Sequence, residues 1–197
     1  MSNAKSHQAA GAIWIEPATP ADLDAVVSIE EACFSAPWTR KMLEAELTGN
    51  QFSCFLIARQ AHNEATGPEP VGYVSFWVVF EELRIMNLAV APSARRQGIG
   101  KRLVTRALEI GCDRSASKGL LEVRASNQTA RRLYGALGFE EVSVRSRYYT
   151  NPIEDAVLME LAPLRRPSGF SGADSFTSAE IVCSKFHSIN REVRHDE

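Results

Sequence analysis

The sequence is poor in the residues that most metal sites and many acid–base sites require. Its four histidines lie outside the segments with a clear hydrophobic pattern, and its four cysteines lack the spacing of a metal site or a disulfide framework. These eight residues are His7, His62, His187, His195, Cys33, Cys54, Cys112 and Cys183. We therefore expect no bound metal and no catalytic histidine, so that acid–base chemistry falls to a carboxylate, a tyrosine or a lysine. Scattered cysteines of this kind are typical of reduced, mostly buried thiols in the cytoplasm.

Long apolar runs and an excess of charge are also missing. No run of about 18 apolar residues could cross a membrane, and residues 1–11 lack the apolar core of a signal peptide. The net charge of −2 argues against a dedicated nucleic-acid-binding protein, although it leaves room for one basic groove. We expect a cytoplasmic protein that binds neither a membrane nor nucleic acid.

The remaining composition is that of an ordinary globular domain, with 197 residues of which 45% are hydrophobic and 23% are charged. Apolar and β-prone runs predict strands at 13–17, 52–58, 71–80, 83–90, 119–124, 139–149 and 156–161. Helical patterns begin after Thr19, after Thr39, near Gly100 and at Gln128, and the last one ends before Gly138. This order predicts an α/β fold with a mixed sheet, mostly antiparallel with one central β-α-β unit, and helices on both faces.

The two ends of the chain differ from this central pattern. Residues 1–11 are small and polar, and Ser2-Asn3-Ala4 resembles what a cloning tag leaves behind. After Pro163 the chain is rich in serine, glycine and polar residues. We therefore predict one domain at 12–163, preceded by a flexible segment and followed by a tail at 164–197 that is flexible or loosely docked.

A glycine-containing turn between a strand and a helix carries the clearest chemical signal. The strand ends near Val90, and Gly98 and Gly100 lack a Cβ, so an anion can approach the unpaired N–H groups that begin the helix. Four cations stand at the same place, namely Arg95, Arg96, Lys101 and Arg102. The dinucleotide pattern G-x-G-x-x-G is incomplete because Leu103 occupies its third glycine position, and no G-x-x-x-x-G-K-[ST] run is present. The turn predicts a diphosphate site of another kind, or else an ordinary turn with solvated cations.

Three linked blocks resemble one known family. The turn Arg95-Arg96-Gln97-Gly98-Ile99-Gly100 is similar to the R/Q-x-x-G-x-G/A signature of the GNAT acetyltransferases, in which backbone amides hold the pyrophosphate of acetyl-CoA. The later blocks at 121–127 (LEVRASN) and 130–139 (ARRLYGALGF) resemble the RimI branch of that family, the ribosomal-protein alanine N-acetyltransferases. Further similarity lies at 34–39, 87–90, 147–149 and Ala156-x-x-Met159, so that the resemblance covers about residues 13–161.

The resemblance implies a GNAT fold in which two central parallel strands splay apart and acetyl-CoA binds in the gap. Its pantetheine arm would pair with one strand like an added strand, and its pyrophosphate would lie at the glycine turn. The cofactor-binding residues that the resemblance implies are Leu88, Ala89, Val90, Arg95, Arg96, Gln97, Gly98, Ile99, Gly100, Lys101 and Asn127. Asn127 is equally well placed to be a plain helix cap.

The resemblance also implies how the reaction proceeds. An amine must lose a proton before it attacks the thioester, and the leaving thiolate needs a proton or a hydrogen bond. Glu122 stands at the position of the family's base and Tyr134 at that of its acid, with direct transfer in a ternary complex and no covalent relay through a cysteine. The alternatives are a strand glutamate paired with Arg124 and a core tyrosine. Glu82 is a second candidate for the base.

The implied acceptor is the N-terminal alanine amine of a ribosomal small-subunit protein. An α-amine has a pKa near 8 and a lysine side chain one near 10.4, so the α-amine needs the weaker base. By the family pattern, Pro37-Trp38 and Arg147-Tyr148-Tyr149 line the acceptor side, although they are equally suited to packing. Two other functions stay open: acetylation of a small amine or a protein lysine, and a catalytically silent acyl-CoA-binding module, against which the pair Glu122 and Tyr134 argues.

Overall fold

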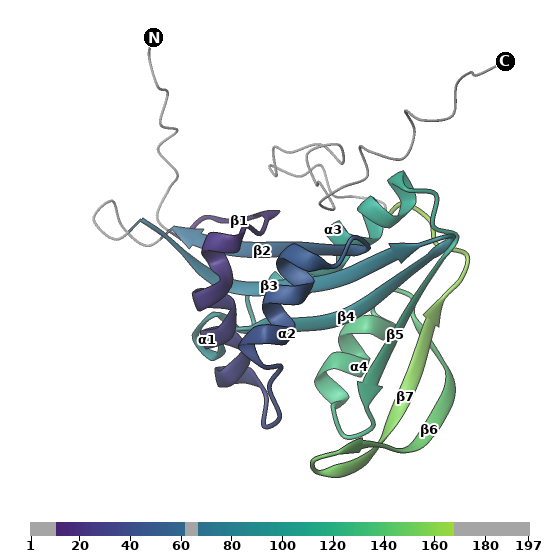
Figure 1. Cartoon of the computed structure of the whole chain (residues 1–197). Coiled ribbons are helices and arrows are strands. Elements are labelled where there is room, and N and C mark those ends of the chain that lie inside the picture. Colours follow the sequence, from purple (N-terminus) through teal and green to yellow (C-terminus); the bar gives the residue numbers. More distant parts are fainter. Residues whose placement is uncertain (1–10, 62–66, 168–197) are drawn as a thin grey trace, which may run out of the picture.

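The computed structural model describes residues 11–61 and 67–167, which form a seven-stranded sheet in the order β1-β2-β3-β4-β5-β7-β6 (Figure 1). The strands are β1 (Ile13–Pro17), β2 (Ser53–Ala61), β3 (Pro68–Val79), β4 (Glu82–Val90), β5 (Lys118–Arg124), β6 (Glu140–Thr150) and β7 (Ile153–Leu161). All neighbouring pairs are antiparallel except β4 and β5, which are parallel. The predicted mixed sheet with one central parallel pair is confirmed.

Helices cover both faces of this sheet, as the sequence pattern predicts. They are α1 (Leu23–Cys33), α2 (Arg40–Glu44), α3 (Ile99–Asp113) and α4 (Gln128–Gly135), with short helical turns η1 (Pro20–Asp22), η2 (Ala45–Gly49) and η3 (Pro92–Ala94). Thr39 caps α2, because its hydroxyl accepts a hydrogen bond from the Met42 N–H at 3.3 Å. Helices α1 and α2 lie together on one face of the sheet (Figure 1).

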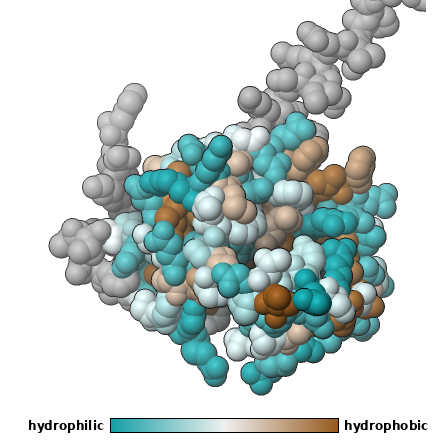
Figure 2. Space-filling model, turned by 60° about the horizontal axis from the view of Figure 1, so that its bottom comes forward, coloured by the Kyte–Doolittle hydropathy of each residue, from teal (hydrophilic) through white to brown (hydrophobic). Residues whose placement is uncertain are grey.

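Two hydrophobic cores hold the layers together. Helix α3 has an apolar stripe at helical spacing that packs against one face of the sheet, and Tyr134 of α4 belongs to the same core. Val26 and Ile29 of α1 pack with Leu43 against the opposite face. Outside these cores, the face turned forward in Figure 2 is mostly hydrophilic with scattered hydrophobic residues.

The two central strands separate partway along their length. Strand β4 pairs with β5 only from Glu82↔Lys118 to Ile85↔Leu121. An irregularity in the β3–β4 pairing follows at once, because Ile85 pairs with Phe76 and Asn87 with Ser75, which leaves Met86 as an extra residue. A bulge bends its strand, so the rest of β4 diverges from β5 and each strand keeps an unpaired edge toward the other. This gap positions the site described below.

Strand β3 begins earlier than the sequence pattern suggests. It starts at Pro68 rather than Val71, and Pro68 and Pro70 pair with Ala61 and Arg59 of β2. Pairing with β4 on the other side begins only at Gly72, so the two prolines occupy an edge where no N–H is needed.

The start of the predicted tail packs on the domain. Leu164 is buried and its N–H donates to the Ser117 carbonyl at 2.7 Å, while Arg166 forms an ion pair with Asp113. The predicted flexible N-terminus, apart from Gly11, and the tail from residue 168 onward lie outside the described residues. Within the described ranges no helix has the length and hydrophobicity needed to span a membrane.

Candidate active site

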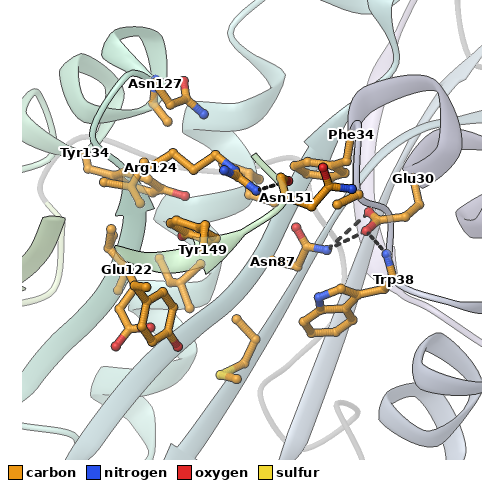
Figure 3. Close-up of a pocket in the computed structure, with 18 of the residues that line it drawn as sticks. Glu30, Phe34, Trp38, Asn87, Glu122, Arg124, Asn127, Tyr134, Tyr149 and Asn151 are labelled. Carbon is orange, nitrogen blue, oxygen red and sulfur yellow. Dashed lines mark hydrogen bonds between the residues drawn. The ribbon is translucent and has the colours of Figure 1, made fainter. Parts of the chain in front are cut away.

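A cavity of about 400 Å³ opens where β4 and β5 separate (Figure 3). Its lining comes from the end of α1 and the segment that follows it, from β4, β5 and α4, and from the turn between β6 and β7. A second hollow of about 520 Å³ adjoins it, and Trp38, Met86, Glu122 and Tyr148 line both. The site is therefore a groove with two chambers that meet at Glu122.

The glycine turn leads into α3 beside this gap. Gly98 is the residue before the helix and has φ 77°, a conformation that favours glycine, and a Cβ there would meet nothing within 4 Å. The first N–H groups of α3 have no partner within the helix, so they face this open space with the positive end of the helix dipole. A cradle of this shape and charge fits a diphosphate.

The residues predicted to bind the cofactor gather around this turn. Arg95 donates from Nε to the Val90 carbonyl at 3.1 Å, which joins the turn to the end of β4. A Cβ on Gly100 would lie 3.5 Å from Leu133, 3.8 Å from Val90 and 3.9 Å from Leu88, so α3, α4 and the open part of β4 are in contact here. Arg95, Arg96, Gln97, Gly98 and Lys101 are exposed, whereas the Ile99 side chain is buried and only its backbone faces the turn.

The structure shows contacts for two further residues of this region, one of them predicted. Arg102 donates from Nη2 to the Ile13 carbonyl at 2.9 Å, so its charge is directed toward β1 and not toward the turn. The Asn127 side chain caps α4 by accepting a hydrogen bond from the Ala130 N–H at 3.0 Å. Asn127 also lines the cavity, so the cap and a place beside the cofactor are compatible.

Glu122 stands on β5 at the junction of the two chambers. Its carboxylate forms an ion pair with Arg145 of β6 and accepts a hydrogen bond from the Tyr148 hydroxyl, which raises the pKa of Tyr148. The side chain is 26% exposed, so it is accessible from the groove. Glu122 is thus a salt-bridged strand glutamate, as the alternative interpretation has it, but its partner is Arg145 and not Arg124, which pairs with Glu154 at 3.1 Å.

Tyr134 lines the same cavity from α4 (Figure 3). It is 6% exposed and packs edge-on against Phe139, with the ring centroids 5.8 Å apart. Burial raises the pKa of Tyr134, so its hydroxyl carries its proton at neutral pH. The ring of Tyr134 is thus part of the core, as the core-tyrosine interpretation has it, and the residue also brings a protonated hydroxyl to the cavity.

Glu82, the second candidate for the base, does not line either chamber. It lies at the beginning of β4, where the paired part of β4 and β5 starts, and the cavity opens at the other end of that part. Hydrogen bonds from Lys118 and Arg84 lower its pKa. The parallel register therefore removes Glu82 from the site.

Only some of the residues that the sequence suggests for the acceptor side line the cavity. Trp38, Tyr148 and Tyr149 line the cavity, whereas Pro37 and Arg147 are absent from its lining. The β6–β7 turn is held in place by Arg124, which donates to the Asn151 carbonyl at 2.9 Å and stacks over the Tyr149 ring at 4.1 Å (Figure 3). Arg124 thus supports the acceptor side and is not a partner of the base.

Sequence reasoning missed a buried carboxylate on the opposite wall. Glu30 of α1 is 1% exposed, and it accepts hydrogen bonds from the Trp38 N–H at 2.8 Å, the Asn87 side-chain amide at 3.2 Å and the Tyr73 hydroxyl. The one available signal was a glutamate within the apolar stripe of α1, next to Ile29 and four residues after Val26.

The described cysteines lie outside both chambers. Cys33, Cys54 and Cys112 are free thiols, and none of them lines either chamber. In residues 11–61 and 67–167 no cluster of histidine, cysteine or carboxylate side chains could hold a metal ion.

Comparisons with known proteins agree with this geometry. The model of the acetyltransferase (GNAT) family matches residues 23–139. The chain is 34% identical over 138 residues to a putative ribosomal protein bS18-alanine N-acetyltransferase of Bacillus subtilis, covering 70% of this chain and 87% of that protein. It is also 34% identical over 142 residues to the ribosomal protein bS18-alanine N-acetyltransferase of Escherichia coli K12, covering 71% and 90%.

Solved structures show the same fold. The ribosomal-protein-S18-alanine N-acetyltransferase of Escherichia coli superposes with a TM-score of 0.68 at 29% identity, covering 82% of this chain and all of that one. NAA60 of Arabidopsis thaliana, solved with acetyl-CoA, superposes with a TM-score of 0.71 at 20% identity, covering 77% and 98%. The chain belongs to the GNAT family and is an N-acetyltransferase with acetyl-CoA as its cosubstrate.

Proposed function

We propose that this enzyme acetylates the N-terminal alanine amine of a ribosomal small-subunit protein in the cytoplasm. The observation that carries the proposal is that Glu122 and Tyr134 line one cavity at the separation of β4 and β5. The relatives named as bS18-alanine N-acetyltransferases support the choice of acceptor. In this proposal the catalytic domain spans residues 12–163, and no nucleic acid or membrane takes part.

Acetyl-CoA would bind along the open edge of β4 and at the start of α3. The edge of β4 from Leu88 to Val90 is free of β5 and would pair with the pantetheine arm through those backbone groups that face β5, apart from the Val90 carbonyl, which accepts from Arg95 and Cys33. The N–H groups from Gly98 to Lys101 would hold the pyrophosphate, and the exposed side chains of Arg95, Arg96, Gln97 and Lys101 would surround it. Asn127 would contact the cofactor from the start of α4.

Glu122 and Tyr134, which both line the cavity, would divide the proton transfers. Glu122 would accept a proton from the ammonium of the acceptor, directly or through one water, and the neutral amine would attack the thioester carbonyl. When the carbon–sulfur bond breaks, Tyr134 would donate its proton to the leaving thiolate, and the attacking nitrogen, cationic after the addition, would release its second proton, which restores the Tyr134 hydroxyl. The hydroxyl carries its proton at neutral pH, and because burial raises its pKa it is a weaker acid than an exposed tyrosine, so its position at the cavity supports this role and its pKa does not.

The second chamber supports a peptide as acceptor. It extends from Glu122 along the sheet, between Trp38 and Trp77 on one side and Arg145 and Tyr148 on the other. When the amine of a peptide acceptor lies at Glu122, this chamber can accommodate the residues that follow the N-terminal residue of the peptide. Its ammonium would compete with Arg145 for the carboxylate.

Release of the CoA thiol with a panel of acceptors tests this proposal. We expect turnover with a peptide that copies an alanine-initiated ribosomal N-terminus, and none with an N-terminally blocked copy that carries a lysine. Turnover of the blocked peptide or of small amines alone would replace the proposal with a lysine or small-amine acetyltransferase. Tight acetyl-CoA binding without turnover of any acceptor would indicate a silent binding module.

A further inference from the structure

The buried carboxylate of Glu30 joins three parts of the molecule at the wall of the cavity. Its donors come from the segment between α1 and α2 (Trp38 N–H), from β3 (Tyr73 hydroxyl) and from β4 (Asn87 amide). The Asn87 amide nitrogen also lies 3.1 Å from the Tyr73 oxygen, so the four residues form one network. Figure 3 shows Glu30, Asn87 and Trp38 together on the wall opposite Glu122 and Tyr134.

A buried carboxylate is an energetically unfavourable way to fill a protein core. Transfer of a carboxylate from water into a protein interior is costly unless hydrogen bonds compensate it. Among the described residues, all the hydrogen-bond donors to Glu30 are uncharged. Burial, followed by the charge of Glu30, raises the pKa of Tyr73, so the Tyr73 hydroxyl stays protonated and donates. An apolar residue at position 30 would avoid this cost but would leave the Trp38 N–H, the Tyr73 hydroxyl and the Asn87 amide without their acceptor, so the carboxylate fixes the relative positions of these three groups.

The function of this network follows from the parts that it connects. Phe34, Ala36 and Trp38, in the segment after α1, line the cavity, and the direct hydrogen bond from Trp38 ties that segment to Glu30. Asn87 follows Met86, the extra residue in β4, and directly precedes the open edge of that strand. Glu30 therefore sets the distance between the aromatic wall of the cavity and the point where β4 leaves β5.

We propose that Glu30 is a positioning residue for the acceptor: it holds the segment 34–38 against β4, so that the amine is confined between that wall and Glu122. This inference deepens the proposed function and rests on it. The acetyl-CoA side depends on the backbone from Leu88 to Val90 and on the turn before α3, and Glu30 contacts the open part of β4 only through the Asn87 side chain. Loss of the carboxylate is thus expected to impair acceptor binding selectively.

Glu30→Gln is the direct test, and Asp22→Asn is its matched control. Glutamine offers one acceptor oxygen in place of two and carries no charge, so the network loses its charge-assisted hydrogen bonds and at least one of its donors loses an acceptor. Asp22 is also a buried carboxylate, 6% exposed, but it pairs with Arg59 and Thr19 and does not line the cavity. Tyr73→Phe, which keeps the ring that stacks on Phe55 at 5.1 Å, is a second and milder variant.

Steady-state kinetics are measured with whichever acceptor the wild-type enzyme turns over, so that failure of the proposed acceptor is recognised separately from failure of this inference. For Glu30→Gln we expect the KM of the acceptor to rise about tenfold or more, as for loss of a hydrogen bond to a charged group, while the KM of acetyl-CoA changes less than about twofold. Tyr73→Phe should show the same split to a smaller extent, and Asp22→Asn should lower only the melting temperature. An unchanged acceptor KM in Tyr73→Phe and in folded Glu30→Gln, or equal losses for both substrates, would overturn the inference.

Discussion

Replacing Tyr134 with phenylalanine removes one hydroxyl and keeps the ring in place. The ring is 6% exposed and packs edge-on against Phe139, and phenylalanine retains that packing. The free energy of unfolding is therefore expected to change by no more than about 1 kcal/mol. Because the substitution changes no residue of the glycine turn or of β4, the Kd of acetyl-CoA should stay within about twofold of the wild-type value.

The catalytic rate is expected to behave differently. A positioned general acid contributes about 10²-fold or more to the rate, so kcat of Tyr134→Phe should fall by at least this factor, or about 2.7 kcal/mol in the activation free energy. The assay is release of CoA thiol at saturating acetyl-CoA and acceptor, with thermal melting as a control for folding. A folded variant with full activity would show that Tyr134 is a core residue alone, and equal losses in kcat and acetyl-CoA affinity would indicate a distorted site.

The remaining predictions concern the base, the cradle and alkaline stability. Glu122→Gln should lower kcat about 10²-fold, whereas Glu82→Gln, outside the cavity, should lower it less than about threefold; equal effects in steady-state assays would return Glu82 to the site. Gly98→Glu should raise the Kd of acetyl-CoA, measured by calorimetry, about tenfold or more, because a side chain is strained at φ 77° and a carboxylate repels a diphosphate. An unchanged Kd would show that the diphosphate does not bind at this turn. The pKa values of Tyr73 and Tyr134 are raised in the folded state, so their contribution to stability is present below about pH 10 and is lost as the pH rises further. The melting temperature of Tyr73→Phe should therefore fall less steeply above about pH 10 than that of the wild-type enzyme. An identical fall in melting temperature would refute this expectation.

The sequence predicts most of the fold because its elements have strong local patterns. Helix α3 carries an apolar stripe from Ile99 to Leu108, and α4 ends at Gly135, followed by a turn that ends at Gly138, which has φ 92°. The start of β3 was less predictable, because Pro68 and Pro70 argue against a strand until the edge position is known. Local pattern thus gives the elements, whereas tertiary context gives their limits.

The site was predictable only in part, because its contacts depend on register. Arg145 reaches Glu122 from β6, 23 positions away, across a sheet whose β6–β7 pairing is irregular between Arg145 and Tyr149. Glu82 was excluded only by the length of the parallel pairing between β4 and β5. Glu30 stands alone as a polar residue in its stripe, and its partners Tyr73 and Asn87 come from other strands. These contacts join residues that are far apart in the sequence, so no local sequence pattern predicts them.

The roles of Glu122 and Tyr134, like those of the residues around the glycine turn, stay predictions that the geometry supports. Both side chains line one cavity, but the acceptor and the cofactor define their functions only when bound. The kinetic variants above separate a catalytic role from a packing role for each of them.

The proposed acetylation of a protein N-terminus is tested most directly by tandem mass spectrometry of the product. The substrate is a peptide that begins with alanine and also contains an internal lysine, incubated with the full chain and acetyl-CoA. We expect one added acetyl group, located on the α-amine of the first residue and absent when Glu122→Gln replaces the wild-type enzyme. Acetylation of the lysine with a free N-terminus would show that the enzyme is a lysine acetyltransferase instead.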